Sequence, residues 1–218
     1  MRQHPFSMIE IILALGVVAV GICSIMVLFP VGAAANRDAQ AETYIANTAD
    51  QILHLVKYNL TSSETKWNNL VKTTTAALPV KTKEDVKTLD STIQSHVGDT
   101  SQWSIPSNEN TIVGQEIQGN VFAYGSAATN TFLLVSHHDN AHQNGAYSTI
   151  DPGTIDFRAV AILWRSQIKV NNTGDDSKDY LAYDYGVTLN LKVFWPAELP
   201  PAAQQSTIYT LDVYKPTF

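Results

Sequence analysis

Residues 6–36 read FSMIEIILALGVVAVGICSIMVLFPVGAAAN, and this stretch decides how the chain is organised. Between Ile11 and Asn36 no residue carries a formal charge. A helix needs about 20 apolar residues to cross the hydrocarbon core of a bilayer, so this run is long enough. Glu10 lies at the N-terminal end of this run. Moving its carboxylate toward the bilayer centre without a partner would cost roughly 2.5–3.5 kcal/mol. We therefore expect Glu10 to have a partner.

The motif around Glu10 resembles the N-terminus of type IV pilins and type II secretion pseudopilins. These proteins carry a short polar or basic leader, a Phe at which the mature chain begins, a Ser or Thr, two apolar residues, a Glu and a long apolar helix. Here residues 1–5 correspond to the leader and Phe6 to the mature start. Ser7 and Glu10 occupy the polar positions that follow, and the resemblance covers about residues 1–55. It implies an α+β fold, with a long N-terminal helix packed against a C-terminal antiparallel sheet.

The resemblance also assigns roles to single residues. A prepilin peptidase would cut between Pro5 and Phe6, but the family normally has Gly where this chain has Pro5. Proline fixes φ and lacks an N–H, so Pro5 alters the bond that the peptidase must accept. Cleavage would expose an α-amine on Phe6, with an intrinsic pKa of about 7.7–8. In family filaments the Glu carboxylate pairs with this amine of a neighbouring subunit, so the resemblance implies that Glu10 selects the register of assembly.

The resemblance further implies a flexible stretch in the helix. In the family, a Gly-to-Pro stretch can loosen when the subunit leaves the bilayer for the filament, and here that stretch runs from Gly16 to Pro30. Gly and Pro are tolerated in membrane helices more readily than in soluble ones. A gentle kink at Pro30 without functional change is the alternative.

Beyond Asn36 the helix is expected to continue as an amphipathic helix. Apolar residues recur at spacings of three and four, which indicates one apolar stripe. The stripe consists of Ile45, Ala49, Ile52, Leu53, Val56 and Leu60. The helix from Phe6 to Leu60 would be roughly 80 Å long at 1.5 Å per residue. The predicted parts of the chain are a leader (1–5), a transmembrane or filament-core half-helix (6–36), an amphipathic half-helix (37–60) and a globular domain (61–218).

The globular domain is expected to hold an antiparallel sheet of about four strands, laid on the amphipathic half-helix in an α+β arrangement. The predicted strands are residues 131–136, 157–170, 187–195 and 209–213. Residues 187–195 alternate apolar and polar side chains, the period of a half-buried strand. Ahead of the sheet, residues 63–76 and 82–97 are expected to be helical, the second with Thr82 as its N-cap. Residues 98–120 are expected to form a loop.

Composition narrows the function classes. The net charge is −6 and the basic residues are scattered, so nucleic-acid binding is not expected. Cys23 is the only cysteine, so the exported domain has no disulfide. It lies in the apolar run, where a thiolate is disfavoured. No phosphate-binding loop, serine elbow or pair of catalytic acids stands out, and we expect a protein that is not an enzyme.

Two segments contain potential metal ligands. The first holds His137, His138, Asp139 and His142, and its alternative is a solvated loop. The second, residues 171–179, is dense in the oxygen ligands that calcium favours. Major pseudopilins often hold calcium in a C-terminal loop, and the candidate ligands here are Asp175, Asp176 and Asp179. An ordinary polar turn is the alternative, so no cofactor is expected other than this potential calcium ion.

These patterns predict a pilin-like structural subunit that crosses the inner membrane once, with its C-terminal domain in the periplasm. It would assemble through its N-terminal helix into a type IV pilus or a type II secretion pseudopilus. Its partners would be other pilin-like subunits, a prepilin peptidase and the inner-membrane assembly platform. The alternative is a membrane-anchored periplasmic binding module that does not polymerise; Pro5 favours it, because an uncut leader would block extraction into a filament. A metal-dependent exported enzyme that uses the His137 loop is a third hypothesis.

Overall fold

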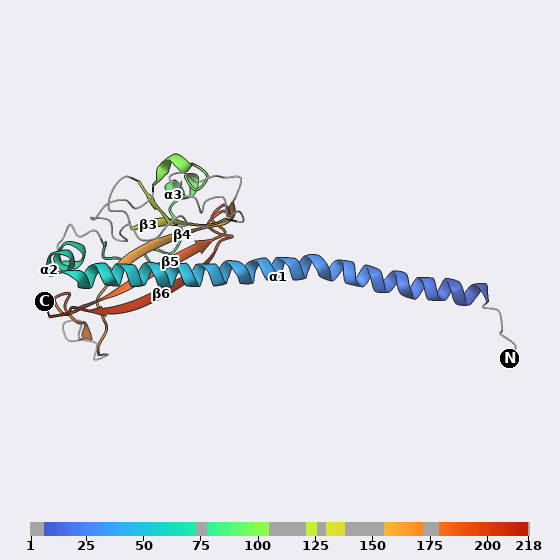
Figure 1. Cartoon of the computed structure of the whole chain (residues 1–218), viewed down its shortest axis with the longest axis horizontal. Helices are drawn as coiled ribbons and strands as arrows, with labels where there is room; N and C mark the ends of the chain where they lie inside the picture. The colour runs from blue at the N-terminus through green and yellow to red at the C-terminus, as the bar shows by residue number, and fades with distance from the viewer. Residues whose placement is uncertain are drawn as a thin grey trace. The chain divides into compact units, whose positions relative to one another are not determined.

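A computed structural model describes residues 7–72, 78–104, 121–125, 130–137, 155–171 and 179–217 of the chain. Two compact units are present, Met1–Thr43 and Tyr44–Phe218. Helix α1 (Met8–Ser62) begins in the first unit and ends in the second, which contains its residues from Tyr44 onward (Figure 1).

The part of α1 that belongs to the second unit buries one stripe of side chains. The buried residues are Ile45, Thr48, Ala49, Ile52, Leu53, Val56 and Leu60. Their spacing of three and four places them on one face of the helix. Thr48 is the one polar member, and its hydroxyl donates a hydrogen bond to the Tyr44 carbonyl oxygen at 2.9 Å. The predicted apolar stripe is therefore confirmed.

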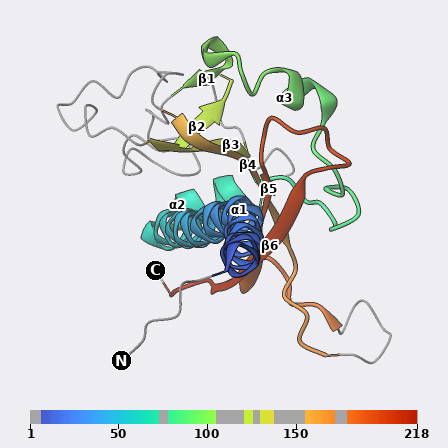
Figure 2. The same ribbon diagram turned by 90° about the vertical axis from the view of Figure 1, so that its right-hand side faces the viewer.

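Within the described residues, one sheet of six strands follows the order of the sequence, and each strand is antiparallel to the next. The strands are β1 (Trp103–Ser104), β2 (Val121–Tyr124), β3 (Thr131–His137), β4 (Ile155–Ser166), β5 (Gly186–Trp195) and β6 (Gln205–Tyr214). Figure 2 shows the sheet curving around the helix. The α+β fold with an antiparallel sheet is confirmed, but the sheet contains β1 and β2 in addition to the four predicted strands.

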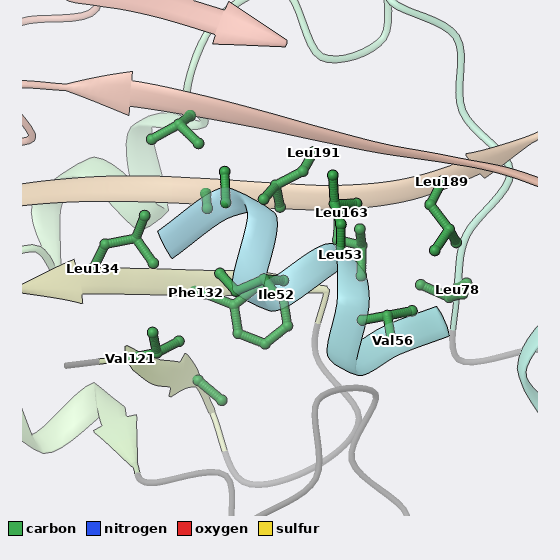
Figure 3. Close-up of a cluster of buried hydrophobic side chains, with 14 of the residues drawn as sticks. Ile52, Leu53, Val56, Leu78, Val121, Phe132, Leu134, Leu163, Leu189 and Leu191 are labelled. Carbon is green, nitrogen blue, oxygen red and sulfur yellow. The ribbon is translucent and has the colours of Figure 1, made fainter. Parts of the chain in front are cut away.

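The two faces of the sheet carry separate clusters of buried apolar side chains. In β4, Ala161 and Leu163 join the cluster shared with α1, which Figure 3 shows. Val160 and Ile162 join the cluster on the other face. Successive side chains of a strand point to opposite faces, so β4 is covered on both sides.

The prediction that β5 is half-buried is wrong. Asn190 and Lys192 alternate with its apolar residues, yet they are only 4% and 8% exposed. The Lys192 ammonium donates hydrogen bonds to the carbonyl oxygens of Val86 at 2.7 Å and Lys87 at 3.0 Å. Removal from water lowers the pKa of Lys192. The segment before β1 therefore covers the face that the alternation assigned to solvent.

The single helix predicted over residues 82–97 is also wrong, because the chain forms a turn first. The Thr82 N–H donates to a carboxylate oxygen of Asp85 at 2.7 Å, and the Asp85 N–H donates to the Thr82 hydroxyl at 3.3 Å. A continuing helix would need the Val86 carbonyl as an acceptor for the N–H four residues later. No such bond forms, and that carbonyl accepts a hydrogen bond from the Lys192 ammonium.

Short helices fill the connections between α1 and β1. They are α2 (Glu64–Trp67), the π-helix η1 (Asn68–Lys72), α3 (Ser91–Ser95) and the 3₁₀ helix η2 (Thr100–Gln102). The helix predicted over residues 63–76 is thus confirmed for residues 64–72, and residues 73–77 lie outside the described chain. The loop predicted over residues 98–120 is interrupted by η2 and β1, and its residues 105–120 also lie outside.

Candidate functional site

The candidate functional site is the exposed apolar part of α1. Every residue from Ser7 to Gln40 is exposed, including large apolar side chains such as Met8 at 83% and Phe29 at 78%. This helix is long and apolar enough to cross a membrane. A continuous apolar surface of this kind marks a membrane or protein interaction site.

Ser7 and Glu10 form a capping box at the start of this helix. The Ser7 N–H donates to a Glu10 carboxylate oxygen at 2.8 Å, and the Glu10 N–H faces the Ser7 hydroxyl at 3.4 Å. This reciprocal pattern satisfies N–H groups that the first turn of a helix leaves unpaired. It also places the carboxylate at the positive end of the helix dipole. Glu10 therefore has a partner within its own chain, which the Ser-x-x-Glu spacing alone would have indicated.

The other residues assigned by the resemblance are only partly described. Pro5 and Phe6 lie outside the described residues. Gly16 and Pro30 both lie inside α1. A Cβ atom added at Gly16 would meet no heavy atom within 4 Å, so packing within the described chain gives no reason for a glycine there.

The predicted metal ligands are mostly outside the described chain. Of the histidine group, only the backbone of His137 is described, as the end of β3. Asp175 and Asp176 lie outside, whereas Asp179 is 3% exposed, and its carbonyl oxygen accepts hydrogen bonds from the N–H groups of Val170 and Asn171. Within the described residues, no group of three or more His, Cys, Asp and Glu side chains is placed to hold a metal ion.

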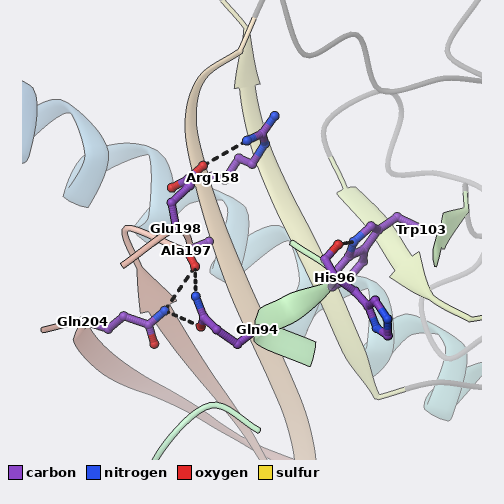
Figure 4. Close-up of polar contacts among 7 residues, drawn as sticks. All are labelled: Gln94, His96, Trp103, Arg158, Ala197, Glu198 and Gln204. Carbon is purple, nitrogen blue, oxygen red and sulfur yellow. Dashed lines mark hydrogen bonds and ion pairs between the residues drawn. The ribbon is translucent and has the colours of Figure 1, made fainter. Parts of the chain in front are cut away.

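Polar contacts on the sheet face away from α1 hold the loop between β5 and β6 (Figure 4). The Gln94 amide donates to the carbonyl oxygens of Ala197 at 2.6 Å and Leu199 at 3.0 Å. The Arg158 guanidinium pairs with Glu198 at 3.2 Å. These contacts cross the connection, which is an arrangement that fixes a loop.

A buried arginine fixes the opposite face. Arg165 in β4 is 5% exposed, donates to the Leu70 carbonyl oxygen at 3.3 Å, and lies 5.0 Å from the centre of the Tyr183 ring. Burial lowers the pKa of Arg165 and raises the pKa of Tyr183. The pair ties η1 to the turn before β5 and has no geometry that suggests catalysis.

Comparisons with protein-family models, with curated proteins and with solved structures found no match to this chain. The resemblance to pilins therefore rests on the residues around Phe6 and Glu10.

Proposed function

We propose that this protein is a structural, pilin-like subunit that α1 inserts into a membrane and that assembles through the same helix. The observation that carries the proposal is the run from Ser7 to Gln40, in which every residue is exposed. Its apolar side chains need lipid or protein around them. Lipid would cover them in the inserted subunit, and the same segments of neighbouring subunits would cover them in a filament.

Glu10 is the assembly residue in this proposal. Its capping bond to Ser7 stabilises the first turn of α1, and no cation among the described residues pairs with its carboxylate. Cleavage after Pro5 would give each subunit a protonated amine on Phe6, and the neighbour's amine would then pair with Glu10. The further partners are a prepilin peptidase and the inner-membrane assembly platform of a type IV pilus or type II secretion pseudopilus. The second unit would lie in the periplasm.

The substitution Glu10→Gln tests this role, because glutamine at this position of a capping box still accepts the Ser7 N–H. The variant keeps the helix start and loses only the charge. Breaking a buried ion pair costs about 3–5 kcal/mol, so incorporation into filaments should fall by a factor of about 150 to 5,000 while membrane insertion stays unchanged. Glu42→Gln is the matched control, since Glu42 is an exposed acid of the same helix.

Quantitative blotting of sheared filaments and of membranes gives the two readouts. Glu10→Gln subunits that assemble as well as Glu42→Gln subunits would refute the pairing. The intact mass of the protein from native membranes supplies the second test. A chain beginning at Phe6, with or without an added methyl group, supports processing, whereas a chain that retains residues 1–5 contradicts it.

One observation favours the alternative of a membrane-anchored binding module that does not polymerise. Glu10 already has a hydrogen-bond partner in Ser7, so its presence does not require a second subunit. Deleting residues 1–35 separates the two functions. A binding module keeps its ligand affinity after this deletion, and a filament subunit loses assembly.

A further inference from the structure

Strand β6 forms one margin of the sheet. It is the last strand in the sheet order, and among the described residues β5 is its only paired neighbour. The ten residues from Gln205 to Tyr214 pair with β5 without a register shift. Figures 1 and 2 show β6 at the side of the sheet beyond β5. The side of β6 that faces away from β5 is called the outer edge below.

The register identifies the backbone groups that point to the outer edge. The Lys215 N–H donates to the Tyr185 carbonyl oxygen at 2.8 Å, and these two residues continue the β5–β6 pairing by one position. Bonded pairs alternate in an antiparallel ladder. Odd-numbered residues of β6 therefore bond to β5, and even-numbered residues direct their N–H and C=O groups outward. The outward residues are Ser206, Ile208, Thr210, Asp212 and Tyr214.

The outer edge lacks the features that usually block strand addition. Edge strands are commonly protected by lysine, proline, bulges or short length. Between Gln205 and Tyr214 there is no lysine or proline, and the pairing with β5 shows no bulge. Asp212 is the only charged residue of the strand, and its carboxylate accepts a hydrogen bond from the Thr188 hydroxyl at 2.6 Å.

Three apolar side chains of β6, on its two faces, are only partly covered. Tyr209 and Leu211 pack partly against the α1-side cluster, and Ile208 packs partly against the cluster on the other face. A strand added at the outer edge would place its own side chains beside all three. Its residues next to Tyr209 and Leu211 would be apolar, and alternate residues of the segment would lie on the face that carries Ile208 and Asp212.

A second copy of this chain does not fit the outer edge. Two β6 strands paired antiparallel are related by a twofold axis, so the Tyr44–Ser62 parts of their α1 helices would run in opposite directions. This pairing therefore conflicts with the proposed function, in which both chains enter one membrane through the residues before Tyr44. In a parallel pair, a residue whose N–H and C=O groups bond across the pair lies opposite a residue whose groups point away. Two identical edges related by a twofold axis would place each residue opposite its own copy, so they cannot form this pattern.

We propose that the outer edge of β6 binds an extended segment of a different polypeptide by strand addition. The segment has apolar residues on the α1 side and a lysine or arginine opposite Asp212, the one charged and exposed side chain of β6. Main-chain hydrogen bonds would give the affinity, and the alternating side chains the specificity. The proposal is independent of filament assembly, which uses the N-terminal half of α1.

Hydrogen exchange resolved at single amides tests this interaction in full-length protein. The comparison is between native membranes and protein extracted in detergent and purified as a monomer. The amides of the five outward residues should exchange about tenfold or more slowly in native membranes, because a bonded amide exchanges only on opening. The amides of Thr207 and Leu211 bond to β5 and should be slow in both samples.

The variant Thr210→Pro removes one outward N–H and leaves the bonds to β5 intact, whereas Thr210→Val keeps that N–H. The outward amides should lose their protection in membranes with Thr210→Pro and keep it with Thr210→Val. Asp212→Lys should reduce it, because the added charge repels the partner's cation. Unchanged slow exchange at Thr207 verifies that each variant folds.

Three results would overturn the proposal. The first is equally fast exchange of the outward amides in native membranes and in detergent, and the second is equal protection in Thr210→Pro and Thr210→Val. The third is protection that appears in purified protein as its concentration rises, which would identify a second copy as the occupant. Protection that persists in Glu10→Gln membranes without filaments supports strand addition even where the proposed assembly role fails.

Discussion

Replacing Ile52 with alanine should destabilise the second unit by about 3 kcal/mol. Ile52 is fully buried between α1 and the sheet, among the side chains shown in Figure 3. The substitution removes three buried carbon atoms at about 0.8 kcal/mol each. A residual cavity of about 50 Å³ at about 24 cal/mol per Å³ adds about 1.2 kcal/mol. The higher helix propensity of alanine returns about 0.4 kcal/mol.

Intrinsic tryptophan fluorescence measures this effect in the full chain in detergent. The four tryptophans, at positions 67, 103, 164 and 195, all lie in the second unit and are at most 6% exposed. Their emission therefore reports unfolding of that unit alone. For a domain of this size, about 3 kcal/mol corresponds to a fall in Tm of about 6–12 °C.

Gln51→Ala is the control, because Gln51 is the exposed neighbour of Ile52 on the same helix. Surface substitutions of this kind change stability by about 0.5 kcal/mol or less. A Tm for Ile52→Ala that matches the Tm for Gln51→Ala would refute the packing of α1 against the sheet.

Two further predictions concern stability at alkaline pH, and they have opposite signs. Burial raises the pKa of Tyr44 to about 12, so the wild type should lose stability relative to Tyr44→Phe between about pH 10 and 12, because the unfolded chain releases the proton first. At neutral pH Tyr44→Phe should cost about 1 kcal/mol, since the hydroxyl donates to the Val135 carbonyl. Burial lowers the pKa of Lys192 below its usual 10.5, so the wild type should gain stability relative to Lys192→Met as the pH rises toward 10.5. Denaturant titrations at successive pH values check both, and parallel curves for wild type and variant would contradict either prediction.

The parts of the fold that the sequence predicted are long. The helical stripe, β5 and β6 show a period, whereas β3 and β4 were predicted as apolar or β-rich runs. The stripe from Ile45 to Leu60 spans several helical turns, and β3, β4, β5 and β6 are each seven residues or longer. A period becomes recognisable only when several repeats are present. β1 has two residues and β2 has four, which is too short for alternation to be distinguished from chance.

The errors have a tertiary cause. Alternation in β5 indicated that Asn190 and Lys192 face water, but residues 82–103 cover that face. The Lys192 ammonium donates to the Val86 carbonyl, so the buried lysine lies against the segment in which the predicted helix is interrupted. The apolar residues of that segment are nevertheless buried as the helical pattern indicated, since Val86, Leu89 and Val97 all belong to the cluster on this face.

The candidate site was predicted as a segment, whereas its detail depends on geometry. The apolar run, its exposed position and the acid at its start follow from residue types alone. The bond from the Ser7 N–H to Glu10 was missed, although Ser-x-x-Glu before an apolar run is a recognised helix start. The sequence contains this Ser-x-x-Glu spacing, but Glu10 was interpreted only as an assembly residue.

The capping box and the proposed assembly pair would act on Glu10 at different stages, and their energies separate them. A carboxylate at a helix N-terminus gains about 0.3–1 kcal/mol from the helix dipole. That is enough for Glu10 at the end of the apolar run, where the headgroups of a bilayer would lie. It does not offset the roughly 2.5–3.5 kcal/mol that the charge costs inside hydrocarbon, nor the larger cost of an unpaired charge in a dry filament core. Ser7 would therefore suffice for an anchored chain, and only a filament would require a cation beside Glu10. Ser7→Ala should weaken the helix start in both states, whereas Glu10→Gln should cost only the dipole energy of about 0.3–1 kcal/mol in the anchored chain and more in the filament.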